Sequence, residues 1–301
     1  MKIARDGLAA GAALVAGSAI IWSFGGALAR EITVDDRWTV VFWRSLWAAL
    51  FLIAFMLLRD GLSGTLHLFR KMGWPGIVVG CCFSIASTTF VVALQFTTVA
   101  NVLLIQSSVP LIAALMGWII FREPVAGPTW IAIAAVILGV AIMVSDALTG
   151  MVSPLGSALA VLIALSISVA TILTRRHSQV RMTPACCLGQ FISIAVAGAL
   201  ASGFTVTLHD MSFLFAFGAL NLGLGLAFFA TGVRLVPATA AALIGTLETV
   251  LGPIWVWFTH DEVPSFRTLL GGSIVLAALV AHLVWQSLRR EAAQVRTAPV
   301  H

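Results

Sequence analysis

Charged residues are scarce in this sequence. Only 10% of its 301 residues are Asp, Glu, Lys or Arg, whereas 60% are hydrophobic. Soluble domains carry about 25% charged residues, and a chain with so little charge cannot cover a globule of this size with polar surface. The scarcity therefore excludes an ordinary soluble protein and predicts that lipid surrounds most of the chain.

The sequence also lacks the motifs of common nucleotide-dependent and hydrolytic proteins. It contains no Walker motif GxxxxGK[ST], which argues against ATP as a direct energy source, and no HExxH or GxSxG motif. Its four cysteines form two adjacent pairs, Cys81–Cys82 and Cys186–Cys187, whose spacing fits neither a disulfide nor a metal site. We therefore predict no cofactor, no metal and no enzyme activity.

Ten apolar segments are long enough to cross a bilayer, which takes about 20 helical residues. The first is too long for the core of a signal peptide and lacks a clean cleavage site, so we interpret it as a retained spanning helix. The connections leave no room for a soluble domain, and we expect the polar tail after Leu288 to be disordered. The segments cover roughly residues 8–29, 38–58, 73–95, 99–120, 128–146, 154–174, 184–203, 212–233, 238–258 and 268–288.

Lysine and arginine are distributed unevenly between the connections. With the N-terminus in the cytoplasm, thirteen of the 17 lie on the cytoplasmic side, Arg44 lies inside the second segment, and the outer side holds Arg30, Arg37 and Arg267. This bias predicts a multi-pass protein of the inner (plasma) membrane with both termini cytoplasmic. The net charge of +5 does not indicate a nucleic-acid partner, because the basic residues lie in short loops between apolar runs.

The chain contains a weak internal repeat. Residues 98–140 align with residues 237–279 at an offset of 139 positions. The aligned pairs include Trp118 with Trp257, Glu123 with Glu262, and Thr129 with Thr268.

Each repeat contains five helices, so the second copy must enter the membrane from the opposite side. We therefore predict an all-α polytopic membrane protein of ten transmembrane helices, built as two inverted five-helix repeats. The predicted units are residues 1–150, residues 151–288 and a cytoplasmic tail at 289–301. Transporters with such repeats bind their substrate near the midplane, between the repeats.

Four stretches carry a family resemblance: WSFGGALAR at 22–30, ANVLLIQSSVPLIAALMGWIIFREP at 100–124, GSALAVLIALSISVATILTRR at 156–176 and ATAAALIGTLETVLGPIWVWFTHDEVP at 238–264. In their order and spacing, the sequence resembles the EamA branch of the drug/metabolite transporter superfamily. The resemblance implies a ten-helix exporter of metabolites. Within the branch the chain is similar to the YddG-type aromatic amino acid exporters, although it has Val109 and Thr249 where Trp and Pro are frequent there.

Two charged residues lie well inside the predicted helices. Arg44 is about 10 Å deep, at about 1.5 Å per residue, where it could bind a substrate carboxylate. The alternatives are a structural ion pair or a side chain that extends to the interface. Glu248 is in the middle of its helix, where burial favours the protonated form and permits proton exchange during transport. The alternative is a carboxyl group held neutral by Thr246 or Thr249.

Two prolines occupy corresponding helices of the two repeats. Pro110 frees the carbonyl of Gln106, and Pro253 frees the carbonyl of Thr249. Bends and free carbonyls in paired helices are typical of a midplane binding site, and kinks that serve only packing are the alternative.

These features define a predicted substrate cavity of polar, aromatic and proline residues. Trp22 is our preferred aromatic wall, with an interfacial anchor as the alternative. Serine and threonine in membrane helices also bond their own backbone or a neighbouring helix. The predicted cavity residues are Trp22, Arg44, Ser84, Ser87, Thr88, Asn101, Gln106, Ser108, Pro110, Ser168, Gln190, Asn221, Phe228, Thr246, Glu248 and Thr249.

The predicted function is a secondary transporter that exports small organic metabolites, in the first place amino acids with aromatic or other apolar side chains. The alternatives are import or export of a vitamin, nucleoside or drug on the same fold, a pore, and a membrane-embedded enzyme using His209–Asp210 or His260–Glu262. The predicted partners are a small-molecule substrate and membrane lipid. A homodimer is left open, because Ser273, Ala277 and Ala281 suit either a dimer face or internal packing.

Overall fold

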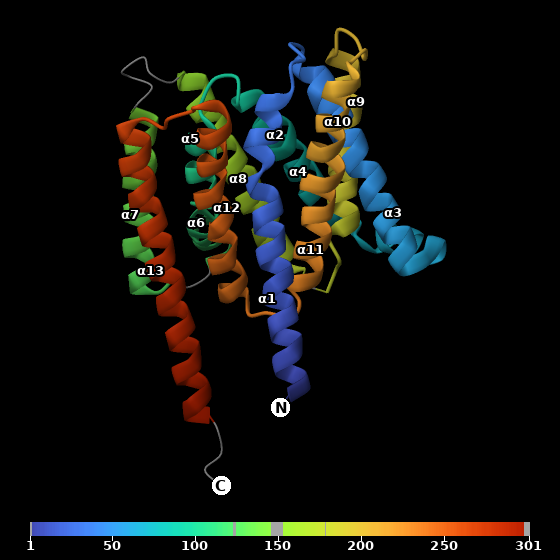
Figure 1. Cartoon of the computed structure of the whole chain (residues 1–301). Helices are drawn as coiled ribbons and strands as arrows, with labels where there is room; N and C mark the ends of the chain where they lie inside the picture. The colour runs from blue at the N-terminus through green and yellow to red at the C-terminus, as the bar shows by residue number, and fades with distance from the viewer. Residues whose placement is uncertain (1, 123–124, 146–152, 178, 298–301) are drawn as a thin grey trace.

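The computed structural model describes residues 2–122, 125–145, 153–177 and 179–297, and every regular element in these ranges is a helix (Figure 1). The predicted all-α class is therefore confirmed. The elements are α1 (Lys2–Ser23), α2 (Gly25–Glu31), α3 (Arg37–Lys71), α4 (Gly73–Ala93), α5 (Val99–Gln106), α6 (Val109–Phe121), α7 (Gly127–Ser145), α8 (Pro154–Arg176), α9 (Thr183–Leu200), α10 (Leu208–Phe215), the π-helix η2 (Ala216–Leu224), α11 (Gly225–Gly232), α12 (Ala238–His260) and α13 (Phe266–Thr297).

Within the described ranges, nine helices or joined helices are long and apolar enough to cross a membrane. The pair α5 and α6, bent by 42°, makes a tenth if it counts as one span. The predicted polytopic membrane protein is therefore confirmed. The start of α1 and the end of α13 lie at the same end of the bundle, which we call the terminal end (Figure 1). The opposite end, where α2 meets the α12–α13 connection, is called the far end.

Two helices continue beyond their predicted ends. Helix α3 passes residue 58 and bends at Gly61, whose φ of 69° suits glycine, so that its last part turns away from the bundle (Figure 1). Helix α13 runs through the tail that was predicted to be disordered, as far as Thr297. The prediction was wrong there because Arg, Glu, Ala and Gln favour helix even where the chain is too polar for lipid.

Breaks in three spans lie close to the middle of the bundle. Helix α1 ends at Ser23 and α2 begins at Gly25, while α5 and α6 are separated at Ser107 and Ser108. The span that begins at α10 passes through η2 before α11, and π-helical turns are frequent at functional sites. Helix α12, in contrast, is continuous through Pro253, so that of the two prolines only Pro110 follows a break in its span.

The strongest helix contacts join the two halves of the chain. Helix α1 packs on α11 and α12, α4 packs on α8 and α9, α3 packs on α9 and η2, and α7 packs on α13. The largest core cluster accordingly takes side chains from both halves, Val99, Leu103 and Ile105 among them, with Ile163 and Val275. The halves therefore share one core, and any cavity between helices is lined by both.

The small-residue stripe of α13 is not part of this core. Ser273, Ala277 and Ala281 are exposed, whereas Val275, Leu279 and Leu283 of the same helix are buried. The internal-packing alternative is therefore wrong for these three residues.

Asp36 connects the start of α3 to the end of α9. Its carboxylate accepts hydrogen bonds from the Trp38 N–H (3.0 Å), the Thr39 hydroxyl (2.9 Å) and the N–H and hydroxyl of Ser202 (2.8 and 2.9 Å). Burial raises the pKa of this carboxyl, but the hydrogen bonds from Ser202, Thr39 and Trp38 lower it by more, so that the pKa lies below its ordinary 3.8. The ionised form of Asp36 therefore stabilises the fold.

Replacing Asp36 with alanine should lower the free energy of unfolding by about 1 kcal/mol or more, since an N-cap is lost. Because the folded pKa lies below the unfolded one, this stabilisation is present above about pH 4 and is lost as the pH falls through the folded value. Thermal unfolding in detergent, at neutral pH and at about pH 3, should show a difference that shrinks in acid. The control is Asp35→Ala, since Asp35 is exposed. An equal loss in both variants would contradict the assignment.

Candidate functional site

The helices enclose a cavity of about 320 Å³, at the lower end of the usual range for small-molecule sites. A smaller cavity of about 190 Å³ adjoins it and shares Gln106, Ile167 and Glu248. Both halves of the chain contribute walls. The residues that line the larger cavity are Trp22, Gly25, Arg44, Leu52, Phe83, Ala86, Ser87, Phe90, Gln106, Ile163, Ile167, Thr171, Cys186, Gln190, Asn221, Leu222, Leu226, Phe229 and Glu248.

Arg44 is the cation of this cavity, and its side chain is only partly satisfied. The residue is 5% exposed. Its Nη1 donates to the carbonyl oxygen (3.1 Å) and the hydroxyl (2.9 Å) of Ser87, and the guanidinium lies 4.1 Å from the ring centre of Phe217. Its Nε is buried without a partner in the described part of the chain. No carboxylate of the described residues forms an ion pair with it. The predicted structural ion pair is therefore not observed.

Glu248 brings a carboxyl group to the same cavity. It lies in α12 and lines both the larger and the smaller space. Among the described residues no hydrogen bond or ion pair reaches its carboxyl group, and the hydroxyl of Thr246 donates instead to the carbonyl oxygen of Leu243 (2.6 Å). The predicted alternative, a carboxyl group held by Thr246, is not observed.

The break between α1 and α2 is held by Asn221 of η2. The Asn221 side-chain amide donates to the carbonyl oxygens of Ile21 (2.5 Å) and Trp22 (3.3 Å). Directly before the break, the hydroxyl of Ser23 accepts a hydrogen bond from the indole of Trp255 in α12 (2.9 Å). Two irregular segments from different halves are thus fixed to each other at the cavity wall.

The indole of Trp22 forms an aromatic wall against α11. Its ring centre lies 5.4 Å from that of Phe229, and its Nε1 is buried without a partner among the described residues. A Cβ atom at Gly225 would collide with this indole, so only glycine leaves room for it. Trp22 therefore lies inside the protein, and the interfacial-anchor alternative is not observed.

Gln190 and Gln106 add neutral polar groups. Gln190 is 2% exposed, and its Oε1 has no partner in the described ranges. Gln106 is the last residue of α5, directly before the break that precedes Pro110. The larger cavity therefore combines an apolar lining with one cation, one carboxyl group and a few amides.

The structure brings most of the predicted residues together. Ten line one or both cavities: Trp22, Arg44, Ser87, Gln106, Pro110, Gln190, Asn221, Thr246, Glu248 and Thr249. Their part in binding stays a prediction.

Six predicted residues are not among those lining either cavity. The hydroxyl of Ser84 is 2.9 Å from that of Ser193 and Thr88 donates to the same Ser193 hydroxyl (3.2 Å), which joins α4 to α9. Ser108 and Ser168 donate to backbone carbonyls of Ile105 (2.5 Å) and Ala164 (2.7 Å), respectively. Asn101 donates to the Thr97 hydroxyl (2.8 Å), and Phe228 packs near Gly17 of α1.

Several lining residues were missed by the sequence prediction. Phe83, Ala86 and Phe90 line the cavity from α4 beside Ser87, and Phe229 lines it from α11 together with Leu226 and with Leu222 of η2. Residues three, four or seven positions from a polar candidate lie on the same face of a helix, and this spacing was the signal that the sequence offered. In an apolar membrane helix, however, every face carries such residues, so spacing alone cannot select one.

Replacing Gly225 with alanine should lower the free energy of unfolding by about 1–3 kcal/mol, because the new methyl group displaces the Trp22 indole from a filled space. The measurement is thermal unfolding of the purified protein. The matched control is Gly245→Ala at the smaller cavity, where a Cβ atom meets nothing within 4 Å. A Gly225→Ala protein as stable as the Gly245→Ala protein would show that the wall is not packed as described.

Comparison with known proteins bears on the first half most directly. Residues 9–145 match the model of the EamA-like transporter family. No curated protein matches the chain. A solved structure titled "Crystal structure of protein" is similar, with a TM-score of 0.64 and 18% sequence identity, over 92% of this chain and 98% of that one.

At that identity the structural similarity shows the fold alone. The family match supports the predicted resemblance of the first half to the EamA branch, a family of transporters. Residues 9–145 are thus similar to the EamA-like transporters, and nearly the whole chain shares its fold with a solved structure.

Proposed function

We propose that the protein is a secondary transporter of the EamA branch that exports small amphipathic metabolites, in the first place amino acids with aromatic or other apolar side chains. One observation carries the proposal. An apolar cavity between the halves is lined by Arg44 and Glu248, and neither forms an ion pair within the described part of the chain.

These two groups match the two ends of an amino acid. A buried cation without a carboxylate is costly, and an anionic ligand lowers that cost. Arginine binds a carboxylate through two parallel hydrogen bonds, and the partnerless Nε of Arg44 is a donor for one of them. An ionised Glu248 would receive the ammonium group. Trp22, Phe83 and Phe229 supply aromatic surface for the side chain.

The shared walls suit alternating access. Helices of the first half pack on helices of the second, as expected for two inverted five-helix repeats, residues 1–150 and 151–288, that rock around a central site. The start of α1 and the end of α13 share one end of the bundle (Figure 1). The excess of Lys and Arg in the connections at that end supports a cytoplasmic position for both termini in the inner membrane.

The enzyme alternative finds little support at its two predicted clusters. Asp210 accepts hydrogen bonds from the N–H of Thr33 (2.8 Å) and the hydroxyl of Thr207 (2.6 Å). His260 lies 3.6 Å from Glu31, and the carboxylate of Glu262 pairs with Arg30. These contacts connect loops and helix ends at the far end, and none of these residues is among those that line the two cavities.

Substrate counterflow in proteoliposomes tests the proposal. Labelled phenylalanine should exchange with internal phenylalanine, whereas phenethylamine, which lacks the carboxylate, and phenylpropionate, which lacks the ammonium group, should compete at least about tenfold more weakly. Transport of neither phenylalanine nor another apolar amino acid would contradict the proposed substrate class, and exchange of a nucleoside or vitamin would support the alternative.

Replacing Arg44 with glutamine should remove the preference for phenylalanine over phenethylamine, since the carboxylate loses its partner. The expected loss of apparent affinity for phenylalanine is about tenfold or more. The matched control is Arg59→Gln, on an exposed part of the same helix, which should transport as the unchanged protein does. An unaltered preference in Arg44→Gln would assign the carboxylate to another group.

Replacing Glu248 with glutamine should abolish transport driven by a pH gradient while folding is retained, because glutamine cannot exchange a proton. Downhill exchange should continue at a reduced rate. Asp261→Asn is the control, since Asp261 is exposed and its left-handed backbone conformation suits asparagine. Unchanged dependence on the pH gradient would exclude Glu248 as the proton carrier.

A further inference from the structure

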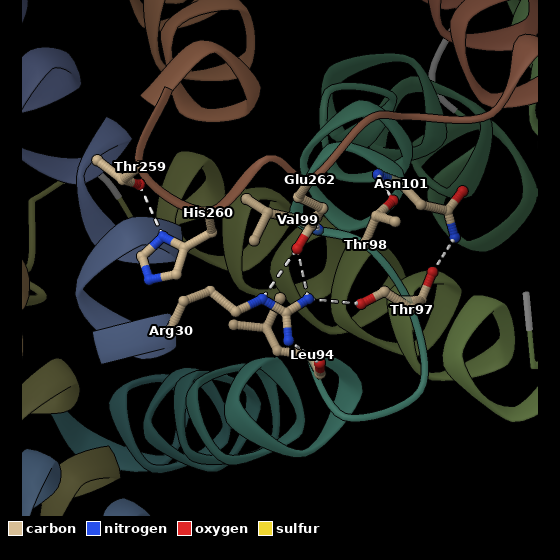
Figure 2. Close-up of polar contacts among 9 residues, drawn as sticks. All are labelled: Arg30, Leu94, Thr97, Thr98, Val99, Asn101, Thr259, His260 and Glu262. Carbon is tan, nitrogen blue, oxygen red and sulfur yellow. Dashed lines mark hydrogen bonds and ion pairs between the residues drawn. The ribbon is translucent and has the colours of Figure 1, made fainter. Parts of the chain in front are cut away.

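A network of hydrogen bonds at the far end ties α2 to two connections of the bundle, α4–α5 and α12–α13 (Figure 2). At its centre, Nη2 and Nε of Arg30 lie 2.7 and 2.9 Å from Oε2 of Glu262. Arg30 belongs to α2, and Glu262 belongs to the connection between α12 and α13. The pair therefore joins the first half of the chain to the second.

Arg30 also holds the connection between α4 and α5. Its Nη1 donates to the carbonyl oxygen of Leu94 (2.8 Å), and its Nη2 donates to that of Thr97 (3.2 Å). All three guanidinium nitrogens are thus engaged, a geometry that only arginine provides. We call Arg30, Glu262, Leu94, Thr97 and Val99 the far-end network.

Glu262 completes the network at the start of α5. Its Oε1 accepts the N–H of Val99 at 2.6 Å, which is one of the donors that a helix leaves unpaired at its first turn. A carboxylate there also interacts favourably with the helix dipole. The position of Glu262 is therefore coupled to that of α5.

The far-end network lies just beyond the cavity on the helices that line it. From the lining residue Gly25 to Arg30 the chain advances five residues, and from Phe90 to Leu94 four, which is about 6–8 Å of helix. On α5, Leu103 lines the smaller cavity and lies four residues after Val99. The network members are not among the residues that line either cavity.

A buried apolar layer separates the network from the cavities. It contains Ala27, Val256 and the side chain of Val99, whose backbone N–H belongs to the network; these residues are 9%, 1% and 0% exposed and belong to the largest core cluster. In contrast, the side chains of Arg30 and Glu262 are 30% and 16% exposed. Partial access to water lowers the cost of separating the two charges, so that this contact is one that can open.

We propose that the far-end network is the closure that shuts the cavity toward the far end, and that Arg30 and Glu262 must separate in each transport cycle. The inference rests on the proposed function, alternating access to the cavity. Separation frees Val99 and the α4–α5 connection together, so that the first part of α5 can move with its lining residues Leu103 and Gln106. Arg30 and Glu262 are thus positioning residues that do not touch substrate.

Sidedness of thiol labelling tests this closure. Cys186 lines the larger cavity, so a protein with Cys81→Ala, Cys82→Ala and Cys187→Ala reports access to the cavity. A membrane-impermeant thiosulfonate is added from one side or the other of oriented vesicles, and the labelling rate is measured. The same protein with Cys186→Ala gives the background.

In the reporter protein with Glu262→Gln or Arg30→Gln, labelling of Cys186 from the far end should accelerate about tenfold, equivalent to about 1.4 kcal/mol. Arg30→Lys, which keeps the charge and loses the fork, should give a smaller increase. The control is Glu31→Gln, because Glu31 is a neighbouring carboxylate, 41% exposed, that contacts His260 instead. It should label at the rate of the unchanged reporter.

Two failures can be told apart. If Cys186 is labelled from neither side, or if phenylalanine has no effect on its labelling, the proposed function fails. If labelling is blocked by phenylalanine but the far-end rate is the same in Glu262→Gln, Arg30→Gln and Glu31→Gln, transport stands and the closure is wrong. Thermal unfolding of each variant shows whether it is folded. A purely structural role of the network would lower stability without changing the side from which Cys186 is labelled.

Discussion

Two arginines of the first half show how the cost of buried charge shapes this protein. Arg30 lies at the end of a helix, where a carboxylate and two carbonyl oxygens satisfy its guanidinium. Arg44 lies deeper, and among the described residues its guanidinium contacts Ser87, the face of Phe217 and, at a greater distance, Phe90. A buried charge without its counterion costs several kcal/mol, so the second arrangement is reasonable only where another anion completes it. The proposed transport of amino acids follows from this difference.

Other features of the structure favour anion binding by the buried Arg44. The helices of both halves pack against each other, and the cavity between them has a mostly apolar lining, which keeps the local dielectric constant low and strengthens the attraction between Arg44 and an anion. Asn221 fixes the break in the first span, and that break places Trp22 at the wall. The broken segments bring polar backbone to the centre of the bundle, which lipid permits only where protein or a cavity surrounds it.

The sequence predicted the number and position of the spans well, because each requires a long apolar run that little else explains. The sequence prediction placed the ends of two helices wrongly, in polar stretches beyond the apolar runs. The extension of α3 beyond Gly61 and of α13 to Thr297 depends on helix propensity in polar stretches.

The charged and amide candidates Arg44, Gln190 and Glu248 line the cavity, since polar groups in lipid need an inward position. Serines were less predictable, because Ser108 and Ser168 satisfy themselves on their own helices. The contacts of Arg30 could not be predicted, because its partners Glu262 and Leu94 are far away in the sequence.

The most direct test of the central claim is the NMR signal of the Arg44 Nε–H group in protein labelled with ¹⁵N-arginine, assigned by its absence in an Arg44→Gln protein. Saturation with phenylalanine should shift this signal, as expected when a free donor gains a carboxylate partner, whereas phenethylamine should leave it in place. If phenylalanine binds, as judged by thermal stabilisation, and the Arg44 signal does not move, the unpaired arginine is not the anion site and the account given for this cavity is wrong.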